Sequence, residues 1–354
     1  MSAAPDPEAL APRLRAMPKV VLHDHLDGSL RPATLLELLR ERGQPAPADN
    51  VAELEAWFYA RSHAGSLTEY LRGFALTVEA MSSLAALERV AFEAAEDARA
   101  DGAVLGEFRI APLLFEDHGI PPEATVEALL AGLARSPLPC GLILCAMRHL
   151  PAAESERVVE LALRYRDQGV IAFDLAGAEL GHPPSDHIRA LRRATEAGLP
   201  LTLHAGEADA ATRVVEAVRL GARRIGHGVR LVDALASTGD RPMVDEVIAA
   251  GAHLEVCPTS NVHTGAAHSI ATHPITSLWR AGVSLSFHTD NRLMSQVTHS
   301  AEALALVRET SLQVADLAKM GLQAAEASFL GADVREAARR AIREWAEREG
   351  MVLG

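Results

Sequence analysis

The most constraining feature of this sequence is a regular alternation of short apolar runs with segments of helical periodicity. The apolar runs have strand-like composition and cover residues 19–22, 104–110, 141–147, 170–175, 199–203, 224–225, 253–256 and 283–287. The segments 154–166, 186–197, 211–220 and 242–250 lie between them and repeat apolar residues at i, i+3 and i+4. Alternating strands and helices predict a parallel sheet, and eight strands are the number that closes a barrel.

Polar side chains at the ends of these runs distinguish a barrel from an open sheet. They are His23, Asp24, His25, Arg109, Asp174, His204, His227 and Asp290. A barrel builds its active site from the carboxyl ends of several strands, whereas an open sheet concentrates it at one switch point, usually beside a glycine-rich turn. The sequence has no G-x-G-x-x-G or P-loop motif. We therefore predict an α/β fold of the TIM (β/α)8 barrel type.

The length of 354 residues fits one barrel of about 250 residues with insertions, although about 150 residues per domain would allow two domains. No Pro/Gly/Ser-rich linker divides the chain, so we expect a single domain over residues 1–354. Residues 1–17 would form an N-terminal segment, which is expected to be flexible. A helical insertion would follow the first strand, and a helical extension would end the chain.

The stretch 48–82, within that insertion, is longer than one crossover helix requires. It carries Leu67, Tyr70, Leu71 and Phe74 at helical spacing. The simpler interpretation of this stripe is an ordinary core-facing helix. The functional interpretation is an apolar lid over the mouth of the barrel that excludes water. The sequence leaves both open.

Composition excludes several functional classes. The formal charge of −13, from 34 Lys and Arg against 47 Asp and Glu, argues against a nucleic-acid or anionic-membrane surface. No run of about 18 apolar residues could span a membrane, and the N-terminus lacks the apolar core of a signal peptide. Three cysteines without a C-x-x-C pair exclude a disulfide framework and a thiolate zinc site. We expect a cytoplasmic protein.

Histidines and an aspartate at the strand ends indicate a metal site. Because side chains alternate along a strand, His23 and His25 would both point to the barrel interior. An H-x-H pair alone is a weak signal, but His204 and Asp290 fall at strand ends of the same face. Neutral imidazole is a preferred zinc ligand, so these residues are expected to bind one zinc ion. The alternative, hydrogen-bonded core histidines, does not explain four such residues on one face.

A binuclear centre is the competing interpretation, since barrels of that kind often bridge two metals with a carboxylated lysine from the fourth strand. The chain has only two lysines, Lys19 before the first strand and Lys319 in a late helical segment. Neither could serve, so one metal per chain is favoured. A carboxylate bridge from Asp174 or Glu179 is left open.

Eight motifs, in order along the chain, are similar to those of one known family. They are KVVLHDHLDGSLRP, EFRIAP, LCAMRH, DLAG, LTLHAGE, RIGHGV, LEVCPTSN and TDN. On these motifs the chain resembles the adenosine deaminase family of the amidohydrolase superfamily over about residues 19–330. The resemblance implies a zinc-dependent barrel enzyme that hydrolyses the 6-amino group of adenine-type bases. The metal ligands would be His23, His25, His204 and Asp290, and the catalytic residues would be Glu207, His227 and Asp290.

Residue chemistry supports this assignment. Zinc lowers the pKa of bound water from 15.7 to roughly 7 and so supplies hydroxide at neutral pH. Attack on the ring carbon that bears the amine needs a proton on the adjacent ring nitrogen, which a buried Glu207 would supply. The plainer interpretation of Glu207 is a carboxylate at a helix N-terminus. His227 would orient the hydroxide or take its proton. The cytidine-type zinc deaminases need P-C-x-x-C, and Ile143 stands in place of its second cysteine, which excludes that class.

The same resemblance implies the substrate contacts. The residues expected to border the substrate are His25, Asp27, Gly177, Asn291, Leu67 and Tyr70. Gly177 would donate its backbone N–H to a purine ring nitrogen, and Asp27 would accept from a ribose hydroxyl. Asn291 stands where many family members have Asp and carries a permanent N–H donor, so adenine recognition is preserved.

Two departures from the family pattern leave the exact aminopurine open. Ala178 stands where an acidic residue is common, which removes a carboxylate near the site. His288 replaces a small polar residue and is either a hydrogen-bonded core histidine or a partner that tunes Asp290 or Glu207.

The leading prediction is a zinc-dependent hydrolase that converts adenosine or 2′-deoxyadenosine to inosine or 2′-deoxyinosine and ammonia. Deamination of adenine, or of a modified adenosine such as an aminofutalosine-type or antibiotic nucleoside, is the alternative within the enzyme class. A non-catalytic nucleoside-binding homologue is the alternative outside it. The expected partner is a small aminopurine nucleoside, with no nucleic acid or membrane, and the sequence does not indicate an oligomeric state.

Overall fold

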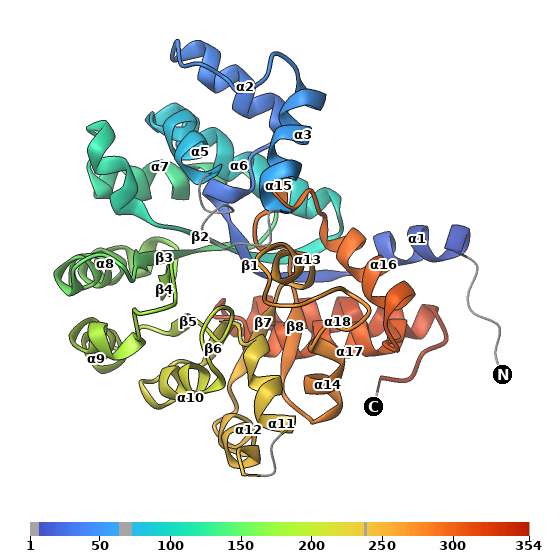
Figure 1. The fold of residues 1–354 in the computed structure, drawn as a ribbon. Coiled ribbons are helices and arrows are strands. Elements are labelled where there is room, and N and C mark those ends of the chain that lie inside the picture. Colours follow the sequence, from blue (N-terminus) through green and yellow to red (C-terminus); the bar gives the residue numbers. More distant parts are fainter. Residues whose placement is uncertain (1–6, 64–72, 237–238, 354) are drawn as a thin grey trace.

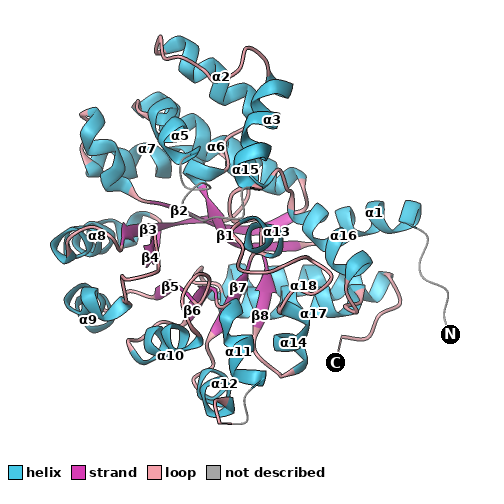
Figure 2. Cartoon of the chain, viewed as in Figure 1, coloured by secondary structure: helices cyan, strands magenta, loops and turns pink. Residues whose placement is uncertain are grey.

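The computed structural model describes residues 7–63, 73–236 and 239–353, and within these ranges eight parallel strands form one sheet surrounded by helices (Figure 1, Figure 2). The strands are β1 (Lys19–His25), β2 (Ala103–Ile110), β3 (Cys140–Met147), β4 (Val170–Ala176), β5 (Leu201–Ala205), β6 (Arg224–His227), β7 (His253–Val256) and β8 (Leu285–Phe287). Each strand pairs in parallel with the next one along the chain. Nearly all their residues are buried, which explains the continuous apolar runs in the sequence.

The sheet closes on itself where β1 meets the residues that follow β8. An isolated parallel bridge pairs Asp24 with Asp290. The backbone N–H of His25 donates to the carbonyl of Asp290 at 2.8 Å, and the N–H of Asp290 donates to the carbonyl of His23 at 3.1 Å. The predicted (β/α)8 barrel is therefore confirmed, and its closing seam brings three of the expected metal ligands together.

Helices connect successive strands, as the alternation predicted. The connecting helices are α6 (Leu84–Ala100), α7 (Pro122–Ala134), α8 (Ala152–Tyr165), α9 (Ile188–Glu196), α10 (Ala211–Arg219), α12 (Arg241–Ala249) and α14 (Ile275–Arg280). Shorter helices lie in the connections after the last three strands and are α11 (Asp233–Ala236), α13 (Pro258–His263) and α15 (Arg292–Ser295). The chain ends with α16 (His299–Glu309), α17 (Val314–Ala327) and α18 (Ala332–Arg348).

Two strands begin two residues later than the apolar runs suggested. The N–H of Leu199 donates to the carbonyl of Ala194 at the end of α9, and the next residue, Pro200, has no N–H. The N–H of Val283 likewise donates to the carbonyl of Leu278 at the end of α14. Leu199 and Val283, the first residues of the two apolar runs, therefore bond to the preceding helix. The strand hydrogen bonds begin after them.

In the helical insertion between β1 and α6, the described residues form α2 (Pro32–Glu41), α3 (Val51–Ser62) and α5 (Gly73–Met81). The side chain of Asn50 caps α3 by accepting from the N–H of Glu53 at 3.0 Å. Leu54 and Phe58 of α3 are buried. Leu67, Tyr70 and Leu71 of the expected stripe lie outside the described residues.

The N-terminal segment, which we expected to be flexible, is helical from residue 7 as α1 (Pro7–Ala16). Leu10 and Leu14 are buried, so the helix is packed against the molecule. The ammonium of Lys19 donates to the carbonyls of Leu14, Arg15 and Met17 at 2.7–2.9 Å and caps the end of α1. Within the described ranges, no helix is both long and apolar enough to cross a membrane.

Candidate active site

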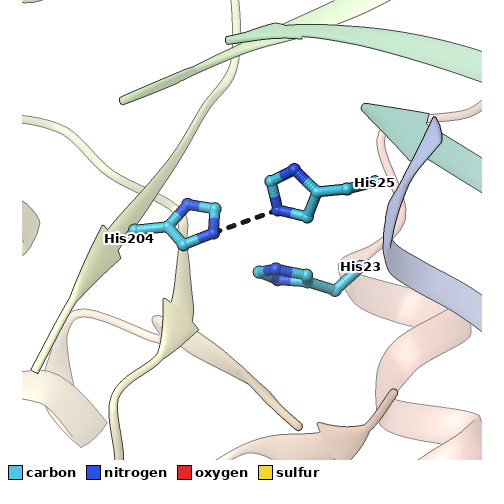
Figure 3. A group of neighbouring side chains, drawn as sticks. All are labelled: His23, His25 and His204. Carbon is cyan, nitrogen blue, oxygen red and sulfur yellow. Dashed lines mark hydrogen bonds between the residues drawn. The ribbon is translucent and has the colours of Figure 1, made fainter. Parts of the chain in front are cut away.

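Three histidine rings from two strands point toward one another at the carboxyl end of the barrel (Figure 3). His23 and His25 come from β1 and His204 from β5, and the Nε2 atoms of His25 and His204 are 3.3 Å apart. Each of the three offers a ligand atom within 4.8 Å of the other two. His23 forms a second such group with His227 and Asp290.

Asp290 completes this cluster from the seam between β8 and β1. Its Oδ1 atom lies 3.3 Å from Nε2 of His23 and 3.5 Å from Nε2 of His25. The φ angles of Asp290 and His227 are +61° and +62°, a left-handed conformation that costs free energy for residues other than glycine. Gly226 is needed between the rings, because a Cβ there would lie 3.1 Å from both His23 and His204.

The cluster fits a divalent metal ion. Nε2 of His23 is buried and has no hydrogen-bond partner among the described residues, so its lone pair is available to an ion. Burial lowers the pKa of His25 well below its usual value, which keeps that imidazole neutral. Three imidazole nitrogens and one carboxylate oxygen are a donor set that zinc accepts.

A buried ionic network, which we call the strand network, contacts two of these histidines, His23 and His204. Oε2 of Glu255 on β7 lies 2.8 Å from Nδ1 of His23, and Oδ2 of Asp174 on β4 lies 3.0 Å from Nδ1 of His204. The guanidinium of Arg109 on β2 donates to both carboxylates, at 2.8 Å to Asp174 and 2.6 Å to Glu255. Since each Nδ1 donates to a carboxylate, each Nε2 is left to face the ion.

The strand network stays ionised although it is fully buried. Arg224 pairs with Glu255 and with Glu107, each at 2.6 Å, and so extends the chain of charges below the site. Burial alone would raise the pKa of Asp174 and of Glu255. The adjacent guanidinium and imidazole groups instead hold both pKa values well below the usual range.

Glu207 and His227 lie beside the cluster. Glu207 follows the end of β5, and His227 is the last residue of β6. Oε2 of Glu207 is 3.5 Å from Nε2 of His227, and both side chains are buried. Oε1 of Glu207 accepts from the hydroxyl of Thr264 at 2.8 Å and from the amide of Asn261 at 3.5 Å. The hydroxyl of Ser260 donates to Oδ2 of Asp290 at 2.6 Å.

Glu179 supplies the carboxylate that Ala178 lacks. Its side chain is buried and accepts from four consecutive backbone N–H groups, those of residues 206–209, in the loop that carries Glu207. This contact fixes the loop after β5. Asp174 and Glu179 are therefore both occupied by other partners, and neither belongs to the groups of described residues that could bind a metal.

A cavity of about 330 Å³ opens beside these residues. Its lining includes His25, Asp27, Gly177, Asn291, Glu207, His227, His204, Asp290, Thr264, Cys145, Met147, His149, Ala111, Leu114, Ala176, Phe74, Ala75 and Val78. Phe74, Ala75 and Val78 belong to α5, so the insertion forms one apolar wall of the cavity. The lid interpretation of the stretch 48–82 stays a prediction.

Three of the residues predicted to contact the substrate line this cavity: Asp27, Gly177 and Asn291. Oδ1 of Asp27 has no hydrogen-bond donor within the described ranges, and burial raises the pKa of Asp27 to about 7. Gly177 lines the cavity just after β4, and its φ of +92° is a conformation that glycine adopts without strain. Asn291 packs over Gly28, where a Cβ would lie only 1.9 Å from its side-chain oxygen.

His288 lies apart from these groups as a hydrogen-bonded core histidine. Its Nδ1 accepts from the N–H of Leu22 at 3.3 Å, and its Nε2 bonds to the hydroxyl of Ser286 at 2.7 Å. Burial lowers its pKa well below the usual value, so it is neutral. Both ring nitrogens of His288 therefore bond to partners other than Asp290 and Glu207, which favours the simpler of the two interpretations.

The structure brings together nearly every residue that the sequence singled out. Leu67, Tyr70 and Leu71 lie outside the described residues. Sequence analysis assigned no role to Glu255, Asn261 or Thr264. Glu255 could have been noticed in the sequence, because it is the one carboxylate within the apolar run that forms β7. The other two follow β7 in a connection whose short helix had no periodicity to reveal it.

Comparison with known proteins agrees with this geometry. The adenosine deaminase family model matches residues 18–345. An adenosine deaminase of Mycobacterium sp. (strain JLS) is 44% identical over 334 residues, which cover 90% of this chain and 92% of that protein. The adenosine deaminase of Mycobacterium tuberculosis (strain ATCC 25177 / H37Ra) is 41% identical and covers 95% of this chain and 94% of its own length.

Solved structures show the same fold. The N6-mAMP deaminase of Arabidopsis has a TM-score of 0.81 at 27% identity, covering 94% of this chain and 99% of that one. The adenine deaminase of Arthrobacter aurescens has a TM-score of 0.83 at 24% identity, covering 94% of this chain and 100% of that one. The second likeness concerns the fold alone.

Proposed function

The chain belongs to the adenosine deaminase family, and on that basis we propose that it hydrolyses adenosine and 2′-deoxyadenosine to inosine and 2′-deoxyinosine with release of ammonia. The observation that carries the proposal is the convergence of His23, His25, His204 and Asp290 beside Glu207 in one cavity. A non-catalytic nucleoside-binding protein would not need strained backbone at both Asp290 and His227.

One zinc ion per chain is proposed as the cofactor, held by Nε2 of the three histidines and by the carboxylate of Asp290. When bound, zinc lowers the pKa of water toward 7 and so supplies the nucleophile. The stoichiometry rests on two facts. Both carboxylates that could bridge a second ion are already paired, and Lys19 is committed to carbonyls at the end of α1.

Glu207 is proposed as the proton donor. Water adds to the ring carbon that bears the amine only when the neighbouring ring nitrogen receives a proton, and Glu207 lines the cavity from a buried position. Its other oxygen is held by Thr264 and Asn261. His227, 3.5 Å away, would orient the attacking oxygen, and Asp290 would hold it next to the ring.

Recognition of the nucleoside is assigned to the opposite wall. The backbone N–H of Gly177 and the side-chain amide of Asn291 would donate to purine ring nitrogens, and Asp27 would accept from a ribose hydroxyl. Its unpaired Oδ1 supports this role, since a buried carboxylate oxygen without a donor is costly until a ligand supplies one. His25 and the apolar residues of the insertion, Leu67 and Tyr70 among them, would enclose the sugar.

The charge of the cavity favours a nucleoside over a nucleotide. None of its described lining residues is Lys or Arg, and three of them, Asp27, Glu207 and Asp290, carry carboxyl groups. A 5′-phosphate would be desolvated near negative charge without a cation to pair it. The cavity therefore argues against N6-methyl-AMP as a substrate, the compound named for an Arabidopsis thaliana deaminase of known structure.

Parallel ultraviolet assays test the proposal with adenosine, 2′-deoxyadenosine, adenine, an antibiotic-type nucleoside and N6-methyl-AMP. We expect adenosine and 2′-deoxyadenosine to be deaminated fastest. Turnover of another aminopurine without turnover of adenosine would refute the substrate assignment. Binding of adenosine without any turnover, in zinc-loaded protein, would favour the non-catalytic alternative.

A further inference from the structure

The segment that follows β7 contacts three catalytic side chains at once. Helix α13 and the residue after it carry Ser260, Asn261 and Thr264, which reach Asp290, His227 and Glu207. In Figure 1, α13 lies in front of the strands at the centre of the barrel. We call these three residues the α13 triad.

Two of these contacts occupy one oxygen of a carboxylate and leave the other free. Ser260 donates to Oδ2 of Asp290, so Oδ1 is left facing the histidines at 3.3 and 3.5 Å. Thr264 donates to Oε1 of Glu207, so Oε2 is left near His227, 3.5 Å from its Nε2. Because one oxygen already has a donor, the proton of the acid is favoured on the other oxygen, where it can itself be donated.

The amide of Asn261 determines the tautomer of His227. Its nitrogen faces Oε1 of Glu207, an acceptor, and the reverse orientation would set two oxygens against each other. The same nitrogen lies 3.1 Å from Nδ1 of His227. Because Asn261 donates there, Nδ1 must accept, and the single proton of a neutral imidazole must lie on Nε2.

We propose that Asn261 and Thr264 are positioning residues that place the mobile proton of Glu207 on Oε2 and the proton of His227 on Nε2. This rests on the proposed function. One consequence is that His227 meets the attacking oxygen as a hydrogen-bond donor and does not accept its proton. Of the two roles that the sequence left open for His227, the first is therefore selected.

Nitrogen-15 NMR of histidine-labelled, zinc-loaded protein tests the tautomer at neutral pH without any substrate. The signals of His227 are assigned by their loss in His227→Gln. We expect Nδ1 to be unprotonated and Nε2 to carry the proton. A proton on Nδ1 in the unaltered protein, alone or in addition, overturns the proposal.

The variant Asn261→Asp replaces the donating amide nitrogen with an oxygen of similar size. We expect the proton of His227 to move to Nδ1, with zinc content unchanged. An unmoved proton in a folded, zinc-loaded variant overturns the role of Asn261. If the variant does not fold, the spectrum of the unaltered protein decides the matter.

Kinetics test Thr264. Thr264→Val removes the hydroxyl at nearly constant shape, and we expect kcat for adenosine to fall about 10-fold, the loss of roughly one hydrogen bond. KM and zinc content should not change, and Thr264→Ser should restore kcat. Thr272→Val, at an exposed threonine, is the matched control. Full kcat in Thr264→Val, or no recovery in Thr264→Ser, overturns its role. If the unaltered protein does not deaminate adenosine, the proposed function fails while the NMR result still stands.

Discussion

Two regions contact the same site, and they use different chemistry. The strand network, formed by Asp174, Arg109 and Glu255, is ionic and contacts His23 and His204, two of the proposed metal ligands. The α13 triad is built of neutral hydroxyl and amide groups and contacts Glu207, His227 and Asp290, the proposed catalytic residues. The strand network rises from the barrel strands, whereas the triad lies on a short helix and the residue after it.

The difference follows from what each set of residues must do. A metal ligand keeps one protonation state, and an ionised carboxylate behind an imidazole fixes its orientation and makes it a better ligand. A proton-transfer group must gain and lose a proton, so a fixed neighbouring charge would favour one of its states. Neutral donors select an atom without adding a charge. The strand network should therefore govern metal binding and the triad should govern turnover.

The largest effect is expected at Glu207, which belongs to the α13 side. Glu207→Gln keeps the shape of the side chain but cannot deliver the proton, so kcat should fall by about 10²–10⁴-fold or more. Zinc content should not change, because the strand network is intact. Kinetics and metal analysis of one preparation measure both. Undiminished turnover would remove Glu207 from its role.

The next effect is expected from Arg109, at the centre of the strand network. Arg109→Met leaves Asp174 without its guanidinium partner in a site with no exposure, which should lower the free energy of unfolding by about 3–5 kcal/mol. Urea denaturation measures this loss. Arg157→Met, in an exposed ion pair, should cost no more than about 1 kcal/mol. Equal losses in the two variants would contradict a structural role for the network.

Glu302 sharpens the contrast, because it is a carboxyl group beside α13 that burial keeps neutral. It accepts from the N–H of Thr259 near the start of α13, and burial raises its pKa to about 8. Between about pH 4.5 and 8 the unfolded chain loses this proton while the folded protein retains it, so stability should fall as the pH rises. The fall should be a few kcal/mol, at about 1.36 kcal/mol per unit of pKa difference.

Glu302→Gln has no proton to lose, so this part of the pH dependence should disappear. Unfolding measured at both ends of the range, for both proteins, tests it. The variant should gain most over the unaltered protein near pH 8. An advantage that is largest near pH 5 would have the wrong sign and would mean that Glu302 is ionised in the folded protein.

The smallest effect on the function of the site is expected from Glu255→Gln, although losing the charge that pairs with Arg109 and Arg224 should also lower stability. The amide still accepts from Nδ1 of His23 but without its charge, and zinc affinity should fall about 10–100-fold. Competition with a zinc chelator measures this. Glu160→Gln, in an exposed ion pair with Arg193, is the control. Unchanged zinc affinity with reduced kcat would place Glu255 on the catalytic side of the comparison.

The sequence predicted the barrel and the metal-facing residues for one reason: both depend on short, local patterns. Apolar runs give the strands, and polar residues at their ends give His23, His204 and Asp290. The α13 triad depends on the path of the chain after β7, which no periodicity encodes. The pairing of Arg109 with Asp174 and Glu255 joins β2, β4 and β7, and only closure of the barrel brings them together.

The central claim is that this cluster binds one zinc ion and uses it to deaminate adenosine. Its most direct test is to remove metal with a chelator, add zinc back in measured steps and follow adenosine turnover at each step. Activity should be absent at the start, rise in proportion to zinc and level off at one ion per chain. Full activity in the metal-free protein, or a plateau only at two ions per chain, would contradict the account.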